Sequence, residues 1–306
     1  MQETCVTVTW MKLCYQVLCL TGESAFADHM EQSIYNSLIG SINADGVTVN
    51  GGLPFDSYSP LLPGLRGRKM GGYKVMENGT FYGCCACIGA AGLGLIGMSS
   101  VSAAKDGLYV NLFLNGTVKA LTPADQPLTL KTATAYPVGG TVRMTVGLNA
   151  PERFTLGVRI PAWSEKTALS VNGVPVAVKS GDYARLDREW KNGDTVLLTL
   201  DLRVMPVRPE DYGVDSKDAP FIALRRGPIV LARDARTGDF VDRAVSPVFN
   251  EDGSVRAVSR AETPFKCVVA QDIALTDGSM LPMVDYASAG KTWTNESRMA
   301  AWFAVK

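Results

Sequence analysis

The sequence has few of the features that mark several common protein classes. It contains one histidine, His29. That residue stands at the edge of an apolar stripe, so we interpret it as a helix-surface residue and find no grounds for a Ser-His-Asp triad. Basic and acidic residues number 30 each. This balance argues against a broad electrostatic surface for nucleic acid or for an anionic membrane.

Long apolar runs are also missing, and no run is long enough to cross a bilayer. The first 22 residues show neither the basic lead nor the small-residue cleavage site of a signal peptide. A helical pattern begins at once instead. We therefore expect the chain to be the C-terminal part of a longer protein, and its compartment stays open between cytoplasm and periplasm.

Cysteine is present in an odd number, seven, and three of the seven lie between positions 84 and 87. A disulfide framework is typical of short secreted chains, so this longer chain favours metal binding or a reactive thiol. Thiolates suit zinc, which prefers four ligands in a tetrahedron. No C-x-x-C pair is present, however, and buried free cysteines often act as small apolar residues. Both interpretations remain open on spacing alone.

The candidate ligands lie in two segments. Cys84 and Cys85, with Cys87, are the sharpest feature, and an irregular loop would let neighbouring thiols reach one ion. Glu3 and Cys5 are candidates for the remaining positions, because a Glu-x-Cys at the start of a helix or on a strand end can point two donors the same way. We interpret the other cysteines as core residues: Cys14, Cys19 and Cys267.

The first hundred residues have a helical period. Apolar residues step by three or four through residues 4–20, which predicts one buried face, and Gly22 supplies a stop. A second helix is expected over 24–42, with which the first would form an antiparallel pair. Residues 43–83 read as a long loop region with a strand pair, and 93–104 as a packed helix. The apolar positions predicted to be buried are Val6, Trp10, Leu13, Val17 and Leu20 in the first helix, and Phe26, Met30, Ile34 and Leu38 in the second.

The pattern Gly89-x-x-Gly92-x-Gly94 lacks the context of a phosphate loop and fits close helix packing.

From Gly107 the period becomes two. The dipeptide Asn115-Gly116 predicts a hairpin, Asn172-Gly173 predicts a second one, and Asn192-Gly193 is a third candidate. The rhythm of short strands is typical of a β-sandwich, followed by a smaller β-module. We expect three domains: 1–102, 103–207 and 208–306.

Several segments together resemble a known family. They are "ETC" before a helix that ends "LTGESAFADHMEQSIYNSLIGS", "CC" followed by small residues and glycines, "FTLGVRIPAWSEKTALSVNG", "YARLDREWKNGDTVLLTL" and "IALRRGPIVLA". In this order they resemble glycoside hydrolase family 127 β-L-arabinofuranosidases and the related family 146. The resemblance implies a mixed α and β fold in which the C-terminal end of an (α/α)6 barrel, residues 1–102, precedes antiparallel β-sandwich domains.

The resemblance also implies a site. Zn²⁺ would be held by Glu3, Cys5, Cys84 and Cys85, and Cys84 would be the nucleophile. Cys85 with Cys87 is an alternative register for the pair. The general acid/base glutamate of the family precedes its Glu-x-Cys motif and would therefore lie upstream of this chain, so we expect the isolated chain to be inactive.

The implied function is a zinc-dependent retaining glycoside hydrolase that releases L-arabinofuranose from β-L-arabinofuranosides. Its expected partner is an arabinofuranose-containing oligosaccharide or glycan, with no nucleic acid and no membrane, and a homodimer is the assembly considered. One alternative is a non-catalytic, zinc-stabilised β-sandwich module that binds carbohydrate. Another is a redox-responsive thiol protein without metal.

Overall fold

The computed structural model describes residues 2–42, 55, 58–65, 74–75, 81–82, 84–215, 220–292 and 295–306. The chain forms two compact units. Unit 1 comprises residues 1–11, 32–93 and 203–306, and unit 2 comprises residues 12–31 and 94–202. No helix in the described ranges is long and apolar enough to span a membrane.

The two helices predicted at the start of the chain are present. Helix α1 runs over Thr4–Thr21 and ends at Gly22, whose φ of 72° is the left-handed conformation that favours glycine. The second helix is continuous but not uniform. It consists of α2 (Ser24–Ser33), a π-helical turn η1 (Ile34–Leu38) and α3 (Ile39–Ser41). Its predicted apolar positions Met30, Ile34 and Leu38 are buried.

The predicted buried face of α1 is wrong. Four of the residues chosen for it are exposed: Val6 (62%), Trp10 (41%), Leu13 (49%) and Leu20 (85%). The buried side carries Val8, Met11, Cys14 and Leu18 instead. Both sides of this helix are apolar, so spacing alone cannot show which side packs. Cys14 lies on the buried side and is a core residue, as predicted. Cys19 was also predicted to be a core residue, but it is exposed.

The helix after the cysteine cluster begins earlier than predicted. Helix α4 covers Cys84–Ser99, and β5 (Val101–Ala104) follows where a helix was expected to continue. Cys84 and Cys85 therefore lie on a helix and not in an irregular loop. The glycines on α4 permit close packing within unit 1, as predicted for two of them. A Cβ at Gly89 would lie 2.6 Å from the ring of Phe55, and one at Gly92 would lie 2.8 Å from Val8 Cγ2.

Gly92 and Gly94 offer a matched pair of substitutions. A Cβ at Gly92 would also lie 3.1 Å from Leu38 Cδ1, whereas among the described residues no atom lies within 4 Å of a Cβ at Gly94. Both replacements gain helix propensity, but only Gly92→Ala must displace neighbours. We expect Gly92→Ala to be less stable than Gly94→Ala by about 1–3 kcal/mol. Urea denaturation measures this difference, and equal free energies of unfolding would contradict the packing.

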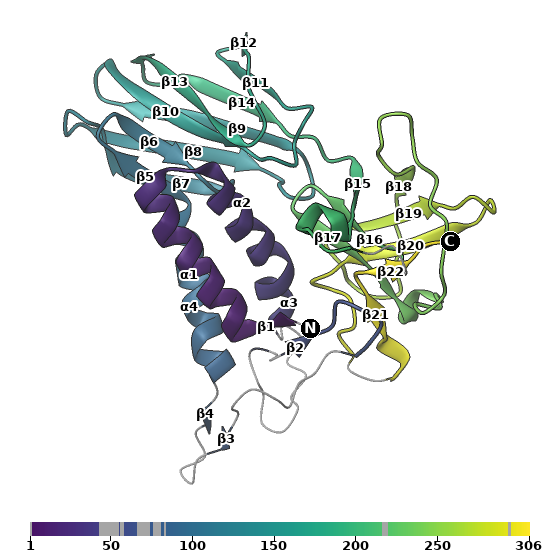
Figure 1. Cartoon of the computed structure of the whole chain (residues 1–306). Helices are drawn as coiled ribbons and strands as arrows, with labels where there is room; N and C mark the ends of the chain where they lie inside the picture. The colour runs from purple at the N-terminus through teal and green to yellow at the C-terminus, as the bar shows by residue number, and fades with distance from the viewer. Residues whose placement is uncertain are drawn as a thin grey trace. The chain divides into compact units, whose positions relative to one another are not determined.

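The strands of unit 2 form two sheets, which lie face to face as the predicted β-sandwich (Figure 1). One sheet has the order β13-β10-β6-β5, and the other has the order β12-β11-β14-β9-β8-β7. Strand β8 alternates exposed and buried residues along most of its length, as expected for a strand with one face on a core. The strands of unit 2 beyond β5 are β6 (Gly107–Val110), β7 (Gly116–Leu121), β8 (Pro127–Thr134), β9 (Thr141–Leu148), β10 (Glu152–Ile160), β11 (Ala168–Val171), β12 (Val174–Val176), β13 (Asp182–Trp190) and β14 (Thr195–Thr199).

One of the three hairpins considered is correct. The candidate at Asn192-Gly193 is wrong, because it separates β13 and β14, which belong to different sheets. Strands β11 and β12 pair across Asn172-Gly173, and both residues have the positive φ that a tight turn requires. The hairpin predicted at Asn115-Gly116 is wrong, because β6 and β7 belong to different sheets. Strand β7 pairs with β8 instead, through the turn at Asp125. Residues 111–115 thus pass from one sheet of the sandwich to the other.

A buried charge cluster joins α2 to strand β10 within unit 2. The Arg159 side chain is fully buried and forms ion pairs with Asp28 and with Glu31, the latter at 2.5 Å. Its guanidinium also donates to the carbonyl of Asn111 and lies over the ring of Phe113. Removing one partner of such a cluster leaves a buried charge uncompensated, so the cluster fixes where α2 packs on the sandwich.

The strands of the C-terminal part of unit 1 form one eight-stranded sheet, in the segment for which the sequence predicted a second, smaller β-sandwich domain. The order is β15-β16-β17-β20-β19-β18, and β22 and β21 extend it by pairing with β16 and β17. Its core includes Leu224, Leu231 and Met283. The strands are β15 (Val204–Val207), β16 (Phe221–Arg226), β17 (Ile229–Asp234), β18 (Ala257–Ser259), β19 (Ala270–Ala274), β20 (Met280–Asp285), β21 (Met299–Ala300) and β22 (Phe303–Ala304).

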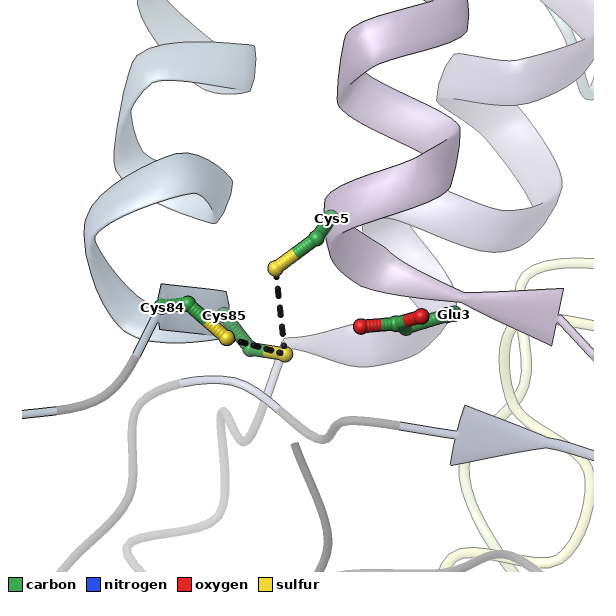
Figure 2. A group of neighbouring side chains, drawn as sticks. All are labelled: Glu3, Cys5, Cys84 and Cys85. Carbon is green, nitrogen blue, oxygen red and sulfur yellow. Dashed lines mark hydrogen bonds between the residues drawn. The ribbon is translucent and has the colours of Figure 1, made fainter. Parts of the chain in front are cut away.

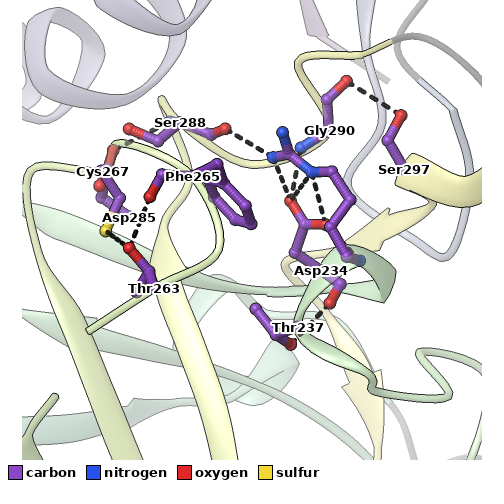
Figure 3. Close-up of polar contacts among 10 residues, drawn as sticks. Asp234, Thr237, Thr263, Phe265, Cys267, Asp285, Ser288, Gly290 and Ser297 are labelled. Carbon is purple, nitrogen blue, oxygen red and sulfur yellow. Dashed lines mark hydrogen bonds and ion pairs between the residues drawn. The ribbon is translucent and has the colours of Figure 1, made fainter.

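Cys267 lies in the loop before β19 and is half-buried, although the sequence suggested a core position in a strand. Its sulfur is 3.5 Å from Thr263 Oγ1 (Figure 3). The nearby Asp285 carboxylate accepts hydrogen bonds from the amides of Val268 and Val269, which hold this loop. Burial raises the pKa of the Cys267 thiol.

Candidate functional site

Glu3 and Cys5 lie where a short strand turns into a helix. Glu3 ends β1 (Gln2–Glu3), which pairs with β2 (Tyr58–Ser59), and Cys5 is in the first turn of α1. Glu3 and Cys5 are both half-buried. The sequence expectation that a Glu-x-Cys at a helix start presents two donors together is met by this geometry, because the donor atoms of Glu3 and Cys5 lie within 4.8 Å of each other.

Cys84 and Cys85 are the first two residues of α4. Cys85 is buried, with 4% of its surface exposed, whereas Cys84 is half-buried. Their place at a helix start explains how adjacent residues can both serve one site. Both residues lie in the first turn of α4, and both sulfurs face the side from which α1 approaches (Figure 2).

These four side chains converge on one point (Figure 2). The ligand atoms of Glu3, Cys5, Cys84 and Cys85 all lie within 4.8 Å of one another. The Cys5 and Cys85 sulfurs are 3.5 Å apart, and those of Cys84 and Cys85 are 3.9 Å apart. A tetrahedral zinc site with Zn–S bonds of about 2.3 Å has ligand atoms about 3.8 Å apart. The spacing and the donor types therefore fit a zinc ion.

The electrostatics of the cluster favour a cation. Burial, followed by hydrogen bonds with the thiols of Cys84 and Cys85, raises the pKa of the Cys5 thiol above its ordinary value. A bound divalent ion would offset the negative charge that neighbouring thiolate ligands bring together. Cys5 lies in the first turn of α1 and Cys84 in that of α4, and the N-terminal end of a helix favours negative charge nearby.

The other sequence candidates lie outside this group. Cys87 is exposed on α4 and is not one of the four converging residues. The geometry thus supports Cys84 with Cys85 over the alternative register of Cys85 with Cys87. His29 is exposed on α2, in agreement with its interpretation as a surface residue.

Two family models match the chain in order. Residues 1–90 match the model described as β-L-arabinofuranosidase, GH127 catalytic domain, and residues 107–202 match the GH127 middle domain. The first match contains all four converging side chains. The chain belongs to glycoside hydrolase family 127. Its predicted membership is therefore confirmed.

Relatives of this family-127 chain are longer. A non-reducing end β-L-arabinofuranosidase of Bifidobacterium longum subsp. longum is 28% identical over 243 residues, which are 76% of this chain and 35% of the relative. Among solved structures, a GH127 β-L-arabinofuranosidase from Geobacillus stearothermophilus T6 matches 99% of this chain and 50% of its own, with a TM-score of 0.71 at 21% identity. A second GH127 β-arabinofuranosidase gives a TM-score of 0.70 at 20% identity, covering 99% of this chain and 49% of its own. The chain thus spans about a third of the curated relative and half of each solved one.

Proposed function

We propose that this family-127 chain carries the zinc–thiolate centre of a retaining β-L-arabinofuranosidase, with Cys84 as its nucleophile. The observation that carries the proposal is the convergence of Glu3, Cys5, Cys84 and Cys85 from two segments far apart in the sequence. The proposed substrate is an arabinofuranose-containing oligosaccharide or glycan, in keeping with the name of the curated relative.

Glu3, Cys5, Cys84 and Cys85 would hold the zinc ion. When bound, zinc keeps the thiols deprotonated at neutral pH, where an ordinary cysteine with a pKa of about 8.5 is mostly protonated. Three thiolates and one carboxylate exceed the charge of the ion and leave the centre with about −2. That excess keeps the Cys84 sulfur nucleophilic and favours the positive charge that develops on a sugar ring.

Cys84 suits the role of nucleophile better than its neighbour, because Cys85 is almost completely buried. In the first step the Cys84 sulfur attacks the anomeric carbon, and a C–S bond forms while the glycosidic C–O bond breaks and the leaving oxygen takes a proton. In the second step water attacks the same carbon and releases the thiolate, so that configuration is retained. We assign the proton transfers to a glutamate that precedes Glu3, as the family resemblance implies.

The helices of this chain would be the C-terminal end of an (α/α)6 barrel. In support, α1 exposes large apolar side chains, Val6, Trp10 and Leu13, of the kind that a further helix covers. We retain residues 1–102, 103–207 and 208–306 as the proposed domains. The family models, which match 1–90 and 107–202, support the first two.

Covalent trapping separates this enzyme from a carbohydrate-binding module with the same metal. The probe is an L-arabinofuranose mimic with a cysteine-reactive group at its anomeric position, and its D-configured counterpart is the control. Applied to the longest purified form that contains residues 1–306, the L-probe should add once per chain, at Cys84, while the D-probe should not. Peptide mapping by mass spectrometry gives the site. Equal labelling of Cys84 and of the exposed Cys19 and Cys87 would contradict the assignment.

A further inference from the structure

A pair of buried hydroxyls lies directly behind the Glu3–Cys5 half of the site. Thr7 is in the first turn of α1, two residues after Cys5, and its Oγ1 donates to the carbonyl oxygen of Glu3 at 2.9 Å. The same Oγ1 lies 2.8 Å from Ser37 Oγ, on the π-helical turn. Both side chains are buried. The contact therefore joins α1 to the second helix within unit 1, at the level of the candidate ligands.

The direction of these bonds follows from the number of protons. A threonine hydroxyl has one proton, and the proton of Thr7 is used toward Glu3. Ser37 must then be the donor to Thr7. The result is a relay in which Ser37 donates to Thr7 and Thr7 donates to the backbone of Glu3, the residue where β1 turns into α1. An unmade hydrogen bond in a buried relay is costly, so each member constrains the next.

The relay is anchored to the C-terminal sheet of unit 1. Asn36, the neighbour of Ser37 on the π-turn, donates from Nδ2 to the carbonyl of Pro228 at 2.8 Å and accepts from the amide of Val230 at 2.7 Å. It also donates to Gln32 of its own helix. Asn36 thus fixes the turn that presents Ser37 to Thr7. Single π-turns inside helices are frequent at functional sites, and this one carries both Asn36 and Ser37.

We propose that Thr7 and Ser37 are positioning residues for the metal centre, which hold the backbone of Glu3 so that its carboxylate and the Cys5 thiol meet Cys84 and Cys85. The proposal rests on the proposed function, since it concerns the same metal site. Groups that orient metal ligands typically contribute 10- to 100-fold to affinity. We expect Thr7→Val and Ser37→Ala each to weaken metal binding by about tenfold.

The test is a titration of the metal-free chain with Co²⁺, which gives a thiolate-to-metal charge-transfer band, followed by competition with Zn²⁺. The matched control is Ser41→Ala, because Ser41 is also buried on this helical segment and its hydroxyl donates to Leu38 of the same segment. Ser41→Ala should bind Co²⁺ as the wild type does. Thr7→Ser, which keeps the hydroxyl, should restore affinity to within about twofold. The double variant Thr7→Val/Ser37→Ala should bind no more weakly than Thr7→Val, since both changes break one relay.

The outcomes separate this inference from the function beneath it. If the wild type gives no charge-transfer band, the metal site itself is refuted, and the inference with it. If the wild type binds Co²⁺ and Thr7→Val binds equally well, the positioning role is overturned while the site stands. Should Thr7→Val fail to fold by circular dichroism, Ser37→Ala decides in its place, because it leaves Thr7 intact. Wild-type affinity in a folded Ser37→Ala likewise overturns the proposal.

Discussion

Replacing Cys84 by serine should lower turnover of a β-L-arabinofuranoside by roughly 10³-fold or more, with little change in KM. A serine hydroxyl is far less acidic than a thiol and would remain protonated, so the covalent step would lose its nucleophile. Binding of the sugar does not need the thiolate, and the loss should therefore fall on kcat. Steady-state kinetics in a form of the protein that hydrolyses the substrate give both constants.

Cys87→Ser is the matched control for this experiment. Cys87 is on the same helix, three residues after Cys84, but it is exposed and outside the converging group. Its replacement should leave kcat within about twofold, because a substitution on the exposed surface, away from the proposed ligands, changes stability little. Zinc content should be measured in both variants, so that loss of the nucleophile is told apart from loss of the ion. A Cys84→Ser enzyme with wild-type kcat would rule out the assigned nucleophile.

Local sequence patterns predicted the strands of the sandwich well, and predicted strand partners less reliably. Asn172-Gly173 makes a hairpin because both residues adopt the left-handed conformation and the flanking strands belong to one sheet. Asn115-Gly116 has the same letters, yet the strands on its two sides belong to opposite sheets. The choice of partner depends on which faces bury together, and a dipeptide does not contain that information.

Helix α1 shows a related limit. Its position and its end at Gly22 follow from spacing and from the glycine, whereas its buried face does not. Trp10 and Leu13 form as regular an apolar stripe as Met11 and Cys14, and only packing decides between them. The π-turn at Ile34–Leu38 was not predicted either. Within it, Asn36 donates to the carbonyl of Pro228 and accepts from the amide of Val230, nearly two hundred positions away, and no local pattern shows these contacts.

The candidate site was predictable by resemblance and not by spacing. Cys5 and Cys85 are 80 positions apart, and no short-range motif links them. The residues alone left zinc and a buried apolar role both open. What the fold adds is the meeting of two helix starts, one carrying Cys5 and the other carrying Cys84 and Cys85. That meeting supplies both the geometry and the electrostatic reason for thiolates at this point.

Metal content should depend on each of the four side chains. Structural zinc is bound with an apparent free energy of about 10–16 kcal/mol, so the loss of one ligand of four should lower affinity by about 10²-fold or more. Cys85→Ala removes the most buried of the four, and Cys19→Ala removes an exposed cysteine outside the group as the control. A chelator should strip zinc from Cys85→Ala at concentrations that leave Cys19→Ala loaded.

The most direct test is therefore the zinc content of the purified chain, measured by inductively coupled plasma mass spectrometry beside the number of thiols that react with a maleimide. We predict one zinc per chain in the wild type and in Cys19→Ala, with Cys5 and Cys85 protected from the reagent until the metal is chelated. A chain without stoichiometric metal, whose Cys5 reacts as readily as the exposed Cys19 and Cys87, would contradict the account.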